Sequence, residues 1–406
     1  MYVYFFVALL LSSNVIYARE ACDIKTIREF YNNVKINGPL LIEADKKKEE
    51  ISSLLNIAEQ RPNPELDFEY LKGEQFGNDT NTYTLTARHI VELGSKRDKR
   101  LLKAKSFQKL KNTELDLSLF NSNLNATIGY QRLAQLNVTI DSVKEAIDTF
   151  EKIINKLSSR DRLNPEETVS LSTLSLASND YRAQLNDLEN EKTLLQGKIS
   201  FLSNCKNVNP SYEYINFNLV NVSDTKSDKT GLPQIENLKV ELAESELDLQ
   251  KSLGYSNISI GPTIEYQGQG IDESISAGIS ISFALPLFHT NSGGKFNALK
   301  VTSSQKVASN NTKEMLRIER MNLVVKLKRS LATLSKMPKL KELELKHLKV
   351  EKLFSRGVVS IPMTIESHRQ QVDFLKSKFD TENDVLNTYG KILLIDGNTT
   401  AFEKLL

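Results

Sequence analysis

The side chains that most often catalyse reactions or bind metals are scattered along this sequence. Four histidines occur without the spacing of a zinc protease, and two cysteines are too few for a cysteine-rich zinc site. We interpret the histidines as surface or packing residues; they are His89, His289, His347 and His368. The run Gly268–Gly270 lacks the third glycine of a phosphate-binding loop and is explained as a turn between strands. The sequence therefore predicts no enzyme activity, no cofactor and no metal site.

The two cysteines stand in an export context. Residues 1–18 contain an apolar run from Val3 to Leu11, and we predict that they are a secretory signal peptide. The run is far shorter than the roughly 20 residues needed to span a bilayer. In an oxidising compartment Cys22 and Cys205 could form a disulfide. Two unpaired thiols and a lipid on Cys22 are the alternatives, although residues 19–21 match a lipid attachment signal poorly.

Composition and charge exclude several classes of protein. The chain has 406 residues with 53 Lys and Arg against 51 Asp and Glu, which excludes a nucleic-acid binder that depends on bulk positive charge. The charged fraction of 26% excludes a polytopic helical membrane protein. Only 10 Pro, 17 Gly and no Trp favour long helices over a set of compact domains.

Long antiparallel helices are predicted from the apolar spacing and from the turn signals. From Ser95 to Leu157 the chain contains no proline, and apolar residues from Ile140 onward recur at intervals of three and four, as in a coiled coil. Asn164 precedes Pro165 and is the predicted cap of a returning helix that ends near Asn204. The first hairpin tip is thus expected near residues 158–165.

The same layout occurs twice along the chain. A second long helix is expected from near Ser292, followed by a tip near 355–361 and a helix over 361–395. We predict a first repeat over 19–204, a connecting segment over 205–231 and a second repeat over 232–406.

Each repeat also contains two strand-like runs of alternating polarity. They lie near 65–73 and 81–93 in the first repeat and near 257–268 and 274–285 in the second. Such alternation fits a transmembrane β-barrel, with lipid outside and water inside. Soluble hairpins packed on helices are the alternative for any single strand. The predicted lipid-facing residues of the second repeat are Ile258, Ile260, Ile264, Ile275, Ile279, Ile281 and Phe283.

Four strands cannot close a membrane barrel. An open sheet edge in hydrocarbon leaves unpaired backbone groups that cost several kcal/mol each. Three copies would supply about 12 strands, which is enough for a barrel with a lumen. The predicted fold class is therefore mainly α with a small β part: long helical hairpins that form an α-barrel, plus four transmembrane strands per chain in a homotrimer.

Four segments carry a family resemblance: RPNPELDF at 61–68, SISAGISISFALPLFHTNSGGKFNAL at 274–299, SRGVVSIPMTIESHRQQVDF at 355–374 and YGKILLIDG at 389–397. In these four segments the chain resembles the TolC-like outer membrane efflux proteins. Within that family it is most similar to the outer membrane components of heavy-metal and cation efflux systems. The resemblance implies a homotrimer with a 12-strand barrel in outer membrane lipid and a long periplasmic α-barrel. It also implies a periplasmic adaptor and an inner membrane pump as partners, with no nucleic acid.

The resemblance also implies which residues carry the function. The adaptor would contact the hairpin tips, at Arg162, Leu163, Asn164, Gly357, Val358, Val359 and Ser360. Glu366 matches an acidic position that faces the lumen, where a threefold ring would favour cations. An ordinary solvated glutamate is the alternative.

The expected function is a passive exit duct for metal cations or small toxic compounds. Polypeptide export by type I secretion is the alternative cargo. A secreted helical coiled-coil protein, pore-forming or adhesin-like, is the alternative from another class.

Overall fold

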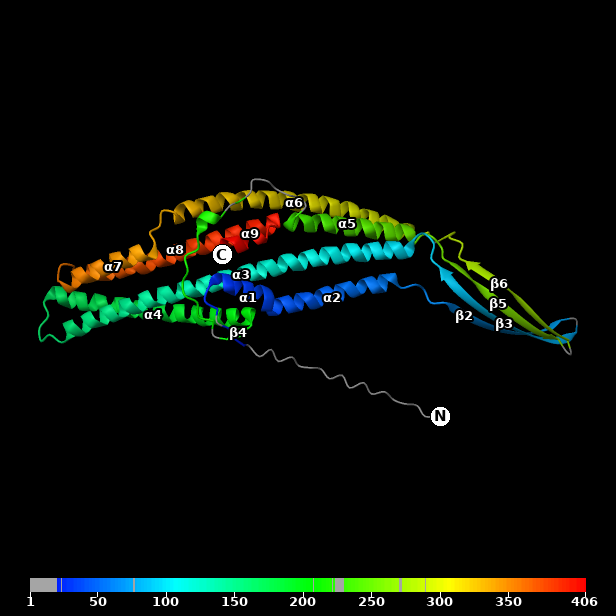
Figure 1. Cartoon of the computed structure of the whole chain (residues 1–406), viewed down its shortest axis with the longest axis horizontal. Helices are drawn as coiled ribbons and strands as arrows, with labels where there is room; N and C mark the ends of the chain where they lie inside the picture. Colours follow the sequence, from blue (N-terminus) through cyan, green and yellow to red (C-terminus); the bar gives the residue numbers. More distant parts are fainter. Residues whose placement is uncertain are drawn as a thin grey trace, which may run out of the picture.

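The computed structural model is an elongated molecule with a small β-sheet at one end and long helices along the rest (Figure 1). It describes residues 20–22, 24–75, 77–206, 208–220, 222, 230–269, 272–288 and 290–406. The predicted signal peptide at 1–18 and His289 lie outside these residues.

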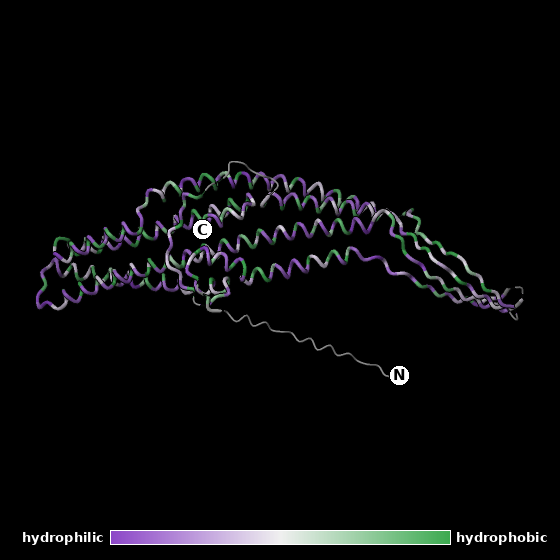
Figure 2. Tube along the Cα trace, in the orientation of Figure 1, coloured by the Kyte–Doolittle hydropathy of each residue, from purple (hydrophilic) through white to green (hydrophobic). Residues whose placement is uncertain are grey.

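Helices account for most of the described chain. The longest, α3, has 63 residues and would measure about 95 Å at roughly 1.5 Å per residue. The helices are α1 (Ile27–Asn37), α2 (Pro39–Glu59), α3 (Lys96–Ser158), α4 (Pro165–Ser203), α5 (Gly231–Ser252), α6 (Ser292–Leu334), α7 (Leu340–Ser355), α8 (Ile361–Asp396) and α9 (Thr400–Leu405), with a 3₁₀ turn at Phe217–Leu219. In Figure 2 hydrophilic residues are distributed along all of the long helices.

Local signals in the sequence explain how the first hairpin turns. The side chain of Asn164 accepts a 2.8 Å hydrogen bond from the backbone of Glu167, whose carboxylate accepts a 3.0 Å bond from the backbone of Asn164. This capping box satisfies two backbone donors at the start of α4, and Pro165 occupies a first-turn position where its missing N–H costs nothing. The sequence of the tip therefore starts α4 at a defined residue.

The second hairpin differs from the sequence expectation. One long helix was predicted from near Ser292 to the tip near residue 355, whereas the structure ends α6 at Leu334 and starts α7 at Leu340. The reason is Pro338, which has no backbone N–H and disfavours helical backbone at Met337.

The main sheet has four antiparallel strands. They are β2 (Glu65–Gln75), β3 (Asn78–Val91), β5 (Ile258–Gln269) and β6 (Asp272–Phe283), in the order β2-β3-β5-β6. β3 begins before the start of the predicted range of 81–93 and also ends before the end of that range. The strand pairs of the two repeats meet at β3 and β5, so β2 and β6 form the sheet edges within one chain.

Two buried apolar clusters hold the helices together. The first lies around the middle of the molecule and includes Phe30, Tyr130 and Phe402. The second lies in the half that contains the hairpin tips and includes Phe150, Leu174 and Val372. Phe150 belongs to the α3 seam predicted from the heptad spacing, and its side chain is fully buried.

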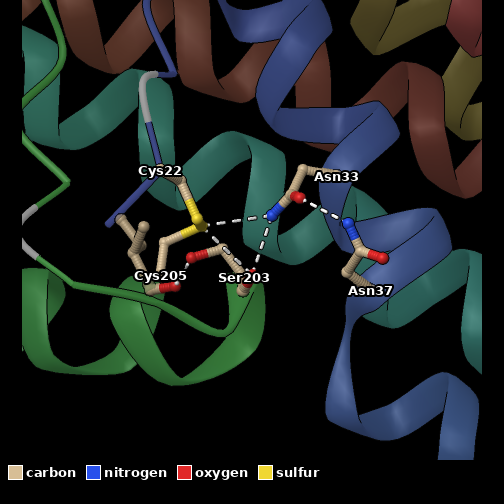
Figure 3. Close-up of a disulfide and its surroundings, with 6 residues drawn as sticks. Cys22, Asn33, Asn37, Ser203 and Cys205 are labelled. Atoms are coloured by element: carbon tan, nitrogen blue, oxygen red, sulfur yellow. Dashed lines mark hydrogen bonds between the residues drawn. A yellow bond between two sulfur atoms is a disulfide. The ribbon is translucent and has the colours of Figure 1, made fainter. Parts of the chain in front are cut away.

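A disulfide joins Cys22 to Cys205, 183 residues further along the chain (Figure 3). Beside it the short strands β1 (Glu20–Ala21) and β4 (Cys205–Lys206) pair in parallel. The side-chain amide of Asn33 donates to the carbonyl oxygen of Ser203 at 2.7 Å and to Sγ of Cys205 at 3.3 Å. The disulfide thus ties the start of the described chain to the end of α4. Of the three states that the sequence left open for the cysteines, the structure contains the paired one.

None of the helices in the described ranges contains a stretch that is both long and apolar enough to cross a membrane.

Candidate functional site

The first candidate functional surface is the face of the sheet that carries its apolar side chains. Strand register places these residues side by side in rows that cross all four strands. One row contains Phe68, Leu85, Ile264 and Ala277, and another contains Tyr70, Tyr83, Tyr266 and Ile275. Because the register pairs apolar residues of one strand with apolar residues of the next, the apolar residues of all four strands form one continuous face.

This apolar face is exposed to solvent within the single chain. The exposed fraction is 69% for Phe68, 51% for Ile264 and 75% for Ile279. On the opposite face the polar residue Thr86 is buried, and its hydroxyl lies 2.9 Å from that of Thr263. Other residues of that face, such as Glu69 and Ser276, are exposed, so within one chain the polar face is not a covered interior. A soluble sheet buries its apolar face on a core, whereas an apolar face that is left exposed is typical of lipid-facing strands.

The structure places the predicted lipid-facing residues on strands β5 and β6, all on this apolar face. Ile260, Ile264, Ile275, Ile279, Ile281 and Phe283 are exposed, and Ile258 is half-buried. Each of these strands has 12 residues, enough for a tilted strand to cross a bilayer.

An aromatic row crosses the sheet between its middle and the end away from the helices. The rings of Tyr70 and Tyr83 lie 4.9 Å apart, and those of Tyr83 and Tyr266 lie 6.0 Å apart. Tyrosine combines an apolar ring with a polar hydroxyl, and such residues gather where a membrane meets water. The row therefore fits the boundary of a membrane-spanning band.

The second candidate surface is formed by the two hairpin tips at the opposite end of the molecule (Figure 1). In the second tip Gly357 has a φ of +74°, a left-handed conformation that favours glycine. The N–H of Gly357 donates to the carbonyl of Phe354 at 2.9 Å, and the N–H of Val358 donates to that of Leu353 at 3.0 Å. These two bonds form a Schellman motif, which ends α7 sharply and directs the chain into α8.

The two valines of the second tip differ in exposure. Val358 is 70% exposed, whereas Val359 is half-buried. The family resemblance implied that both valines contact the adaptor. Within this pair Val358 is the residue available to a partner, and Ser360 and Gly357 beside it are exposed as well.

The first tip has a different construction. Arg162 and Asn164 are exposed, while Leu163 is half-buried and packs against the apolar cluster of the tip half. Phe354 and Ile361 of the second hairpin pack against the same cluster. The two tips therefore share one supporting core, although only the second has a glycine at its turn.

Glu366 lies on α8 just beyond the second tip, on an exposed helix surface. Its carboxylate accepts a 2.7 Å hydrogen bond from the Arg369 guanidinium and a 2.8 Å bond from the amide of Gln370. The contact with Arg369 holds the pKa of Glu366 below its usual range. Its negative charge is therefore present at neutral pH and partly compensated on its own helix.

Two groups of buried polar residues were not identified from the sequence. Glu382, which interrupts the apolar spacing of α8, is buried beside Lys378 at 3.7 Å and accepts hydrogen bonds from Gln135 and Tyr212, each 2.9 Å long. His347 and His368 were interpreted as surface or packing residues, and the structure brings the centres of their rings to 4.5 Å. The available signal for the second group was the spacing of His347 and Glu351, which puts both on one face of a helix.

Comparisons with known proteins bear on the fold. Neither a family model nor a curated protein sequence matches the chain. Several solved structures are similar to it, and three are described. The outer membrane protein VceC from Vibrio cholerae has a TM-score of 0.66 and 14% identity, covering 91% of this chain and 96% of its own. The Campylobacter jejuni CmeC outer membrane channel has a TM-score of 0.68 and 13% identity, covering 92% of this chain and 86% of its own.

The third is the open state of the Neisseria gonorrhoeae MtrE outer membrane channel, with a TM-score of 0.61 and 11% identity over 95% of this chain and 92% of its own. At such identities the comparison establishes the fold, and the match covers nearly the whole chain. This chain therefore has the fold of the TolC-like outer membrane channels.

Proposed function

We propose that the chain is one subunit of a homotrimeric exit duct in the outer membrane. Each subunit would contribute its four strands to a barrel of about 12 strands, and the helices would extend the tube into the periplasm. The duct would work passively, with a periplasmic adaptor at its tips and an inner membrane pump that supplies the cargo. It would carry out no chemistry of its own.

The observation that carries this proposal is the exposed apolar face of the sheet. A surface that exposes Phe68, Ile264 and Ile279 would be costly in water, because each large apolar side chain contributes about 1.5–3 kcal/mol when removed from water. Lipid removes that cost. The two sheet edges, β2 and β6, would find partners on neighbouring copies.

The tips support the part of the proposal that concerns the adaptor. Val358 is an exposed apolar residue on a rigid turn at the end of the helices opposite the sheet. A partner that covers it would gain apolar contact and could act on α7 and α8 together. Arg162 and Asn164 of the first tip would offer polar contacts to the same partner.

The cargo follows from the sequence resemblance to cation efflux components. Metal cations or small toxic compounds are the proposed cargo. Glu366 would contribute negative potential along the path of a cation, reduced by its contact with Arg369.

Membrane fractionation of native cells, combined with mass determination in mild detergent, tests the assembly. We expect the protein in the outer membrane fraction and a detergent-solubilised mass of three chains. A soluble product, or a membrane protein that crosslinks only as monomer and dimer, would contradict the duct. The cargo is tested by comparing the sensitivity of a deletion strain to zinc, copper and organic dyes.

A further inference from the structure

We propose that His347, His368 and Glu351 form a binding site for a divalent transition-metal cation, zinc being the best fit, within the wall of the helical region. His347 and Glu351 come from α7 and His368 from α8. The inference does not rest on the proposed duct function, because the site lies within one chain and its occupancy can be measured on purified protein.

The geometry of the three side chains carries the inference. Their potential ligand atoms all lie within 4.8 Å of one another. In a tetrahedral zinc site with bonds of about 2.0–2.1 Å, neighbouring ligand atoms are roughly 3.4 Å apart. Small side-chain movements of about 1 Å would therefore bring the three groups onto one cation.

The two histidines are deeply buried with nitrogen atoms that lack partners. The exposed fraction is 5% for His347 and 1% for His368. Both ring nitrogens of His347 and Nε2 of His368 have no hydrogen-bond partner among the described residues. Buried polar atoms are nearly always paired, and an unpaired one costs about 1–3 kcal/mol. A bound cation would satisfy these nitrogens.

The structure also fixes the tautomer of His368. Its Nδ1 lies 2.9 Å from the backbone carbonyl oxygen of Thr364. A carbonyl can only accept, so Nδ1 carries the proton and Nε2 carries the free lone pair. A histidine that binds a metal through one nitrogen usually donates from the other in this manner, which fixes the ring orientation.

The types of ligand select the class of cation. Two imidazoles with one carboxylate match zinc and its neighbours in the transition series. They do not match Ca²⁺ or Mg²⁺, which prefer oxygen ligands.

A fourth ligand and an entry route are available on α3. The carboxylate of Glu145 lies 3.7 Å from Nε2 of His347, the same distance as that of Glu351. The side chains of both glutamates are partly exposed, so a cation can reach the buried rings from solvent.

The position of the site gives it a mechanical consequence. His347 lies eight residues before the end of α7 and His368 seven residues after the start of α8, about 10–12 Å from the second tip at roughly 1.5 Å per residue. A cation bound here would clamp α7 to α8, and to α3 through Glu145. It would thus hold together the helices that carry Val358.

The test measures zinc binding by the purified, metal-stripped protein in detergent. Calorimetric titration with ZnCl₂ is expected to give one zinc per chain, and Co²⁺ is expected to produce the visible absorption of a tetrahedral nitrogen and oxygen site. His347→Gln and His368→Gln should each weaken zinc binding at least 10-fold. The matched control is His89→Gln, an exposed histidine on strand β3, which should leave binding unchanged.

A second variant separates binding from folding. Glu351→Gln keeps the edge-to-face packing of the two rings and removes only a charged ligand, so it should fold normally and weaken zinc binding about 10-fold. Absence of stoichiometric zinc in the wild type, or equal affinity in the wild type and all three variants, would overturn the site. In that case the histidines are packing residues only. Neither result depends on whether the protein exports a cargo.

Discussion

The hydroxyl group of Tyr212 donates a 2.9 Å hydrogen bond to Oε1 of Glu382, joining the segment between the two repeats to the buried side of α8. The other carboxylate oxygen accepts from Gln135 of α3. Lys378, one helical turn earlier, is buried beside the same carboxylate. Three distant parts of the sequence thus meet at one carboxyl group.

Removing this carboxylate should strongly destabilise the protein. Glu382→Ala leaves Lys378 buried without its counter-charge, a loss typically worth about 3–5 kcal/mol. The matched control is Glu314→Ala, which breaks an exposed ion pair with Arg317 and should cost about 0–1 kcal/mol. Urea unfolding followed by helical circular dichroism measures both. Equal midpoints for the two variants would contradict a structural role for the buried group.

The same carboxylate should contribute a defined pH dependence. Burial raises the pKa of Glu382 in the folded state above its ordinary value. The folded protein therefore takes up this proton at a higher pH than the unfolded chain does. The stabilisation that Glu382 contributes is fully present below the pKa that this residue has in the unfolded chain. It is lost as the pH rises through the pKa of Glu382 in the folded protein.

Glu382→Gln isolates this contribution. As the pH is lowered from neutral toward 4.5, the free energy of unfolding of the wild type should rise relative to that of the variant. The difference between the two proteins cancels the titration of all other groups. A difference that stays constant over this range, or that shrinks as the pH falls, would show that the group is not shifted upward.

Charge placed on the two faces of β6 should have opposite outcomes. Ile279→Arg introduces a cation on the exposed apolar face, which costs about 2–4 kcal/mol near the middle of a bilayer. Ser280→Arg, the adjacent control, points to the other face and should still assemble. Outer membrane trimer content is the readout. If both variants assembled equally, the apolar face would not be in contact with lipid.

Val358 rather than Val359 is the residue to change at the second tip. Val358→Asp should abolish efflux while trimer assembly and membrane insertion remain normal, because Val358 is exposed and the tip ends of α7 and α8 lie far from the sheet (Figure 1). Val359→Asp would also disturb packing, since Val359 is half-buried. Val307→Asp is the control: Val307 is 59% exposed on α6, away from the tips, and its replacement should leave efflux intact. Full efflux with Val358→Asp would exclude this residue from adaptor contact.

The disulfide between Cys22 and Cys205 should stabilise the helical region measurably. Closing a loop of 183 residues restricts the unfolded chain, and loss of such a bond typically costs about 2–5 kcal/mol. Cys22→Ser together with Cys205→Ser should lower the midpoint of unfolding, and reduction of the wild type should lower it similarly. Unchanged unfolding after complete reduction would show that the bond adds no stability.

Local patterns in the sequence predicted the long elements well, because each has its own start and stop signals. The 63 residues of α3 follow from an apolar seam without proline, and Asn164 with Pro165 starts α4 where the turn was expected. The prediction of one continuous helix after Ser292 was wrong because it did not take Pro338 into account, and this proline separates α6 from α7. The strand alternation predicted which side chains share a face, although β3 begins earlier than expected.

The sequence could not predict contacts between residues that only the fold brings together. His347 and His368 belong to different helices, and nothing in their spacing fixes the angle at which α7 packs on α8. Glu382 interrupts the apolar spacing of its helix, but its partner Tyr212 lies in an irregular segment, so the sequence does not show that the two meet. The exposure difference between Val358 and Val359 depends on the turn geometry set by Gly357.

The free edges of the four-stranded sheet affect how readily the unassembled chain aggregates. Within the described residues, a single chain presents the outer edges of β2 and β6 without a neighbouring strand, next to an exposed apolar face. Such edges pair readily with any other extended chain. If the chain works as the proposed trimeric duct, a lone copy is at risk of aggregating in the periplasm, and this risk grows with its concentration. In that case we expect escort by a chaperone that covers the sheet, and rapid proteolysis of surplus copies that do not find two others.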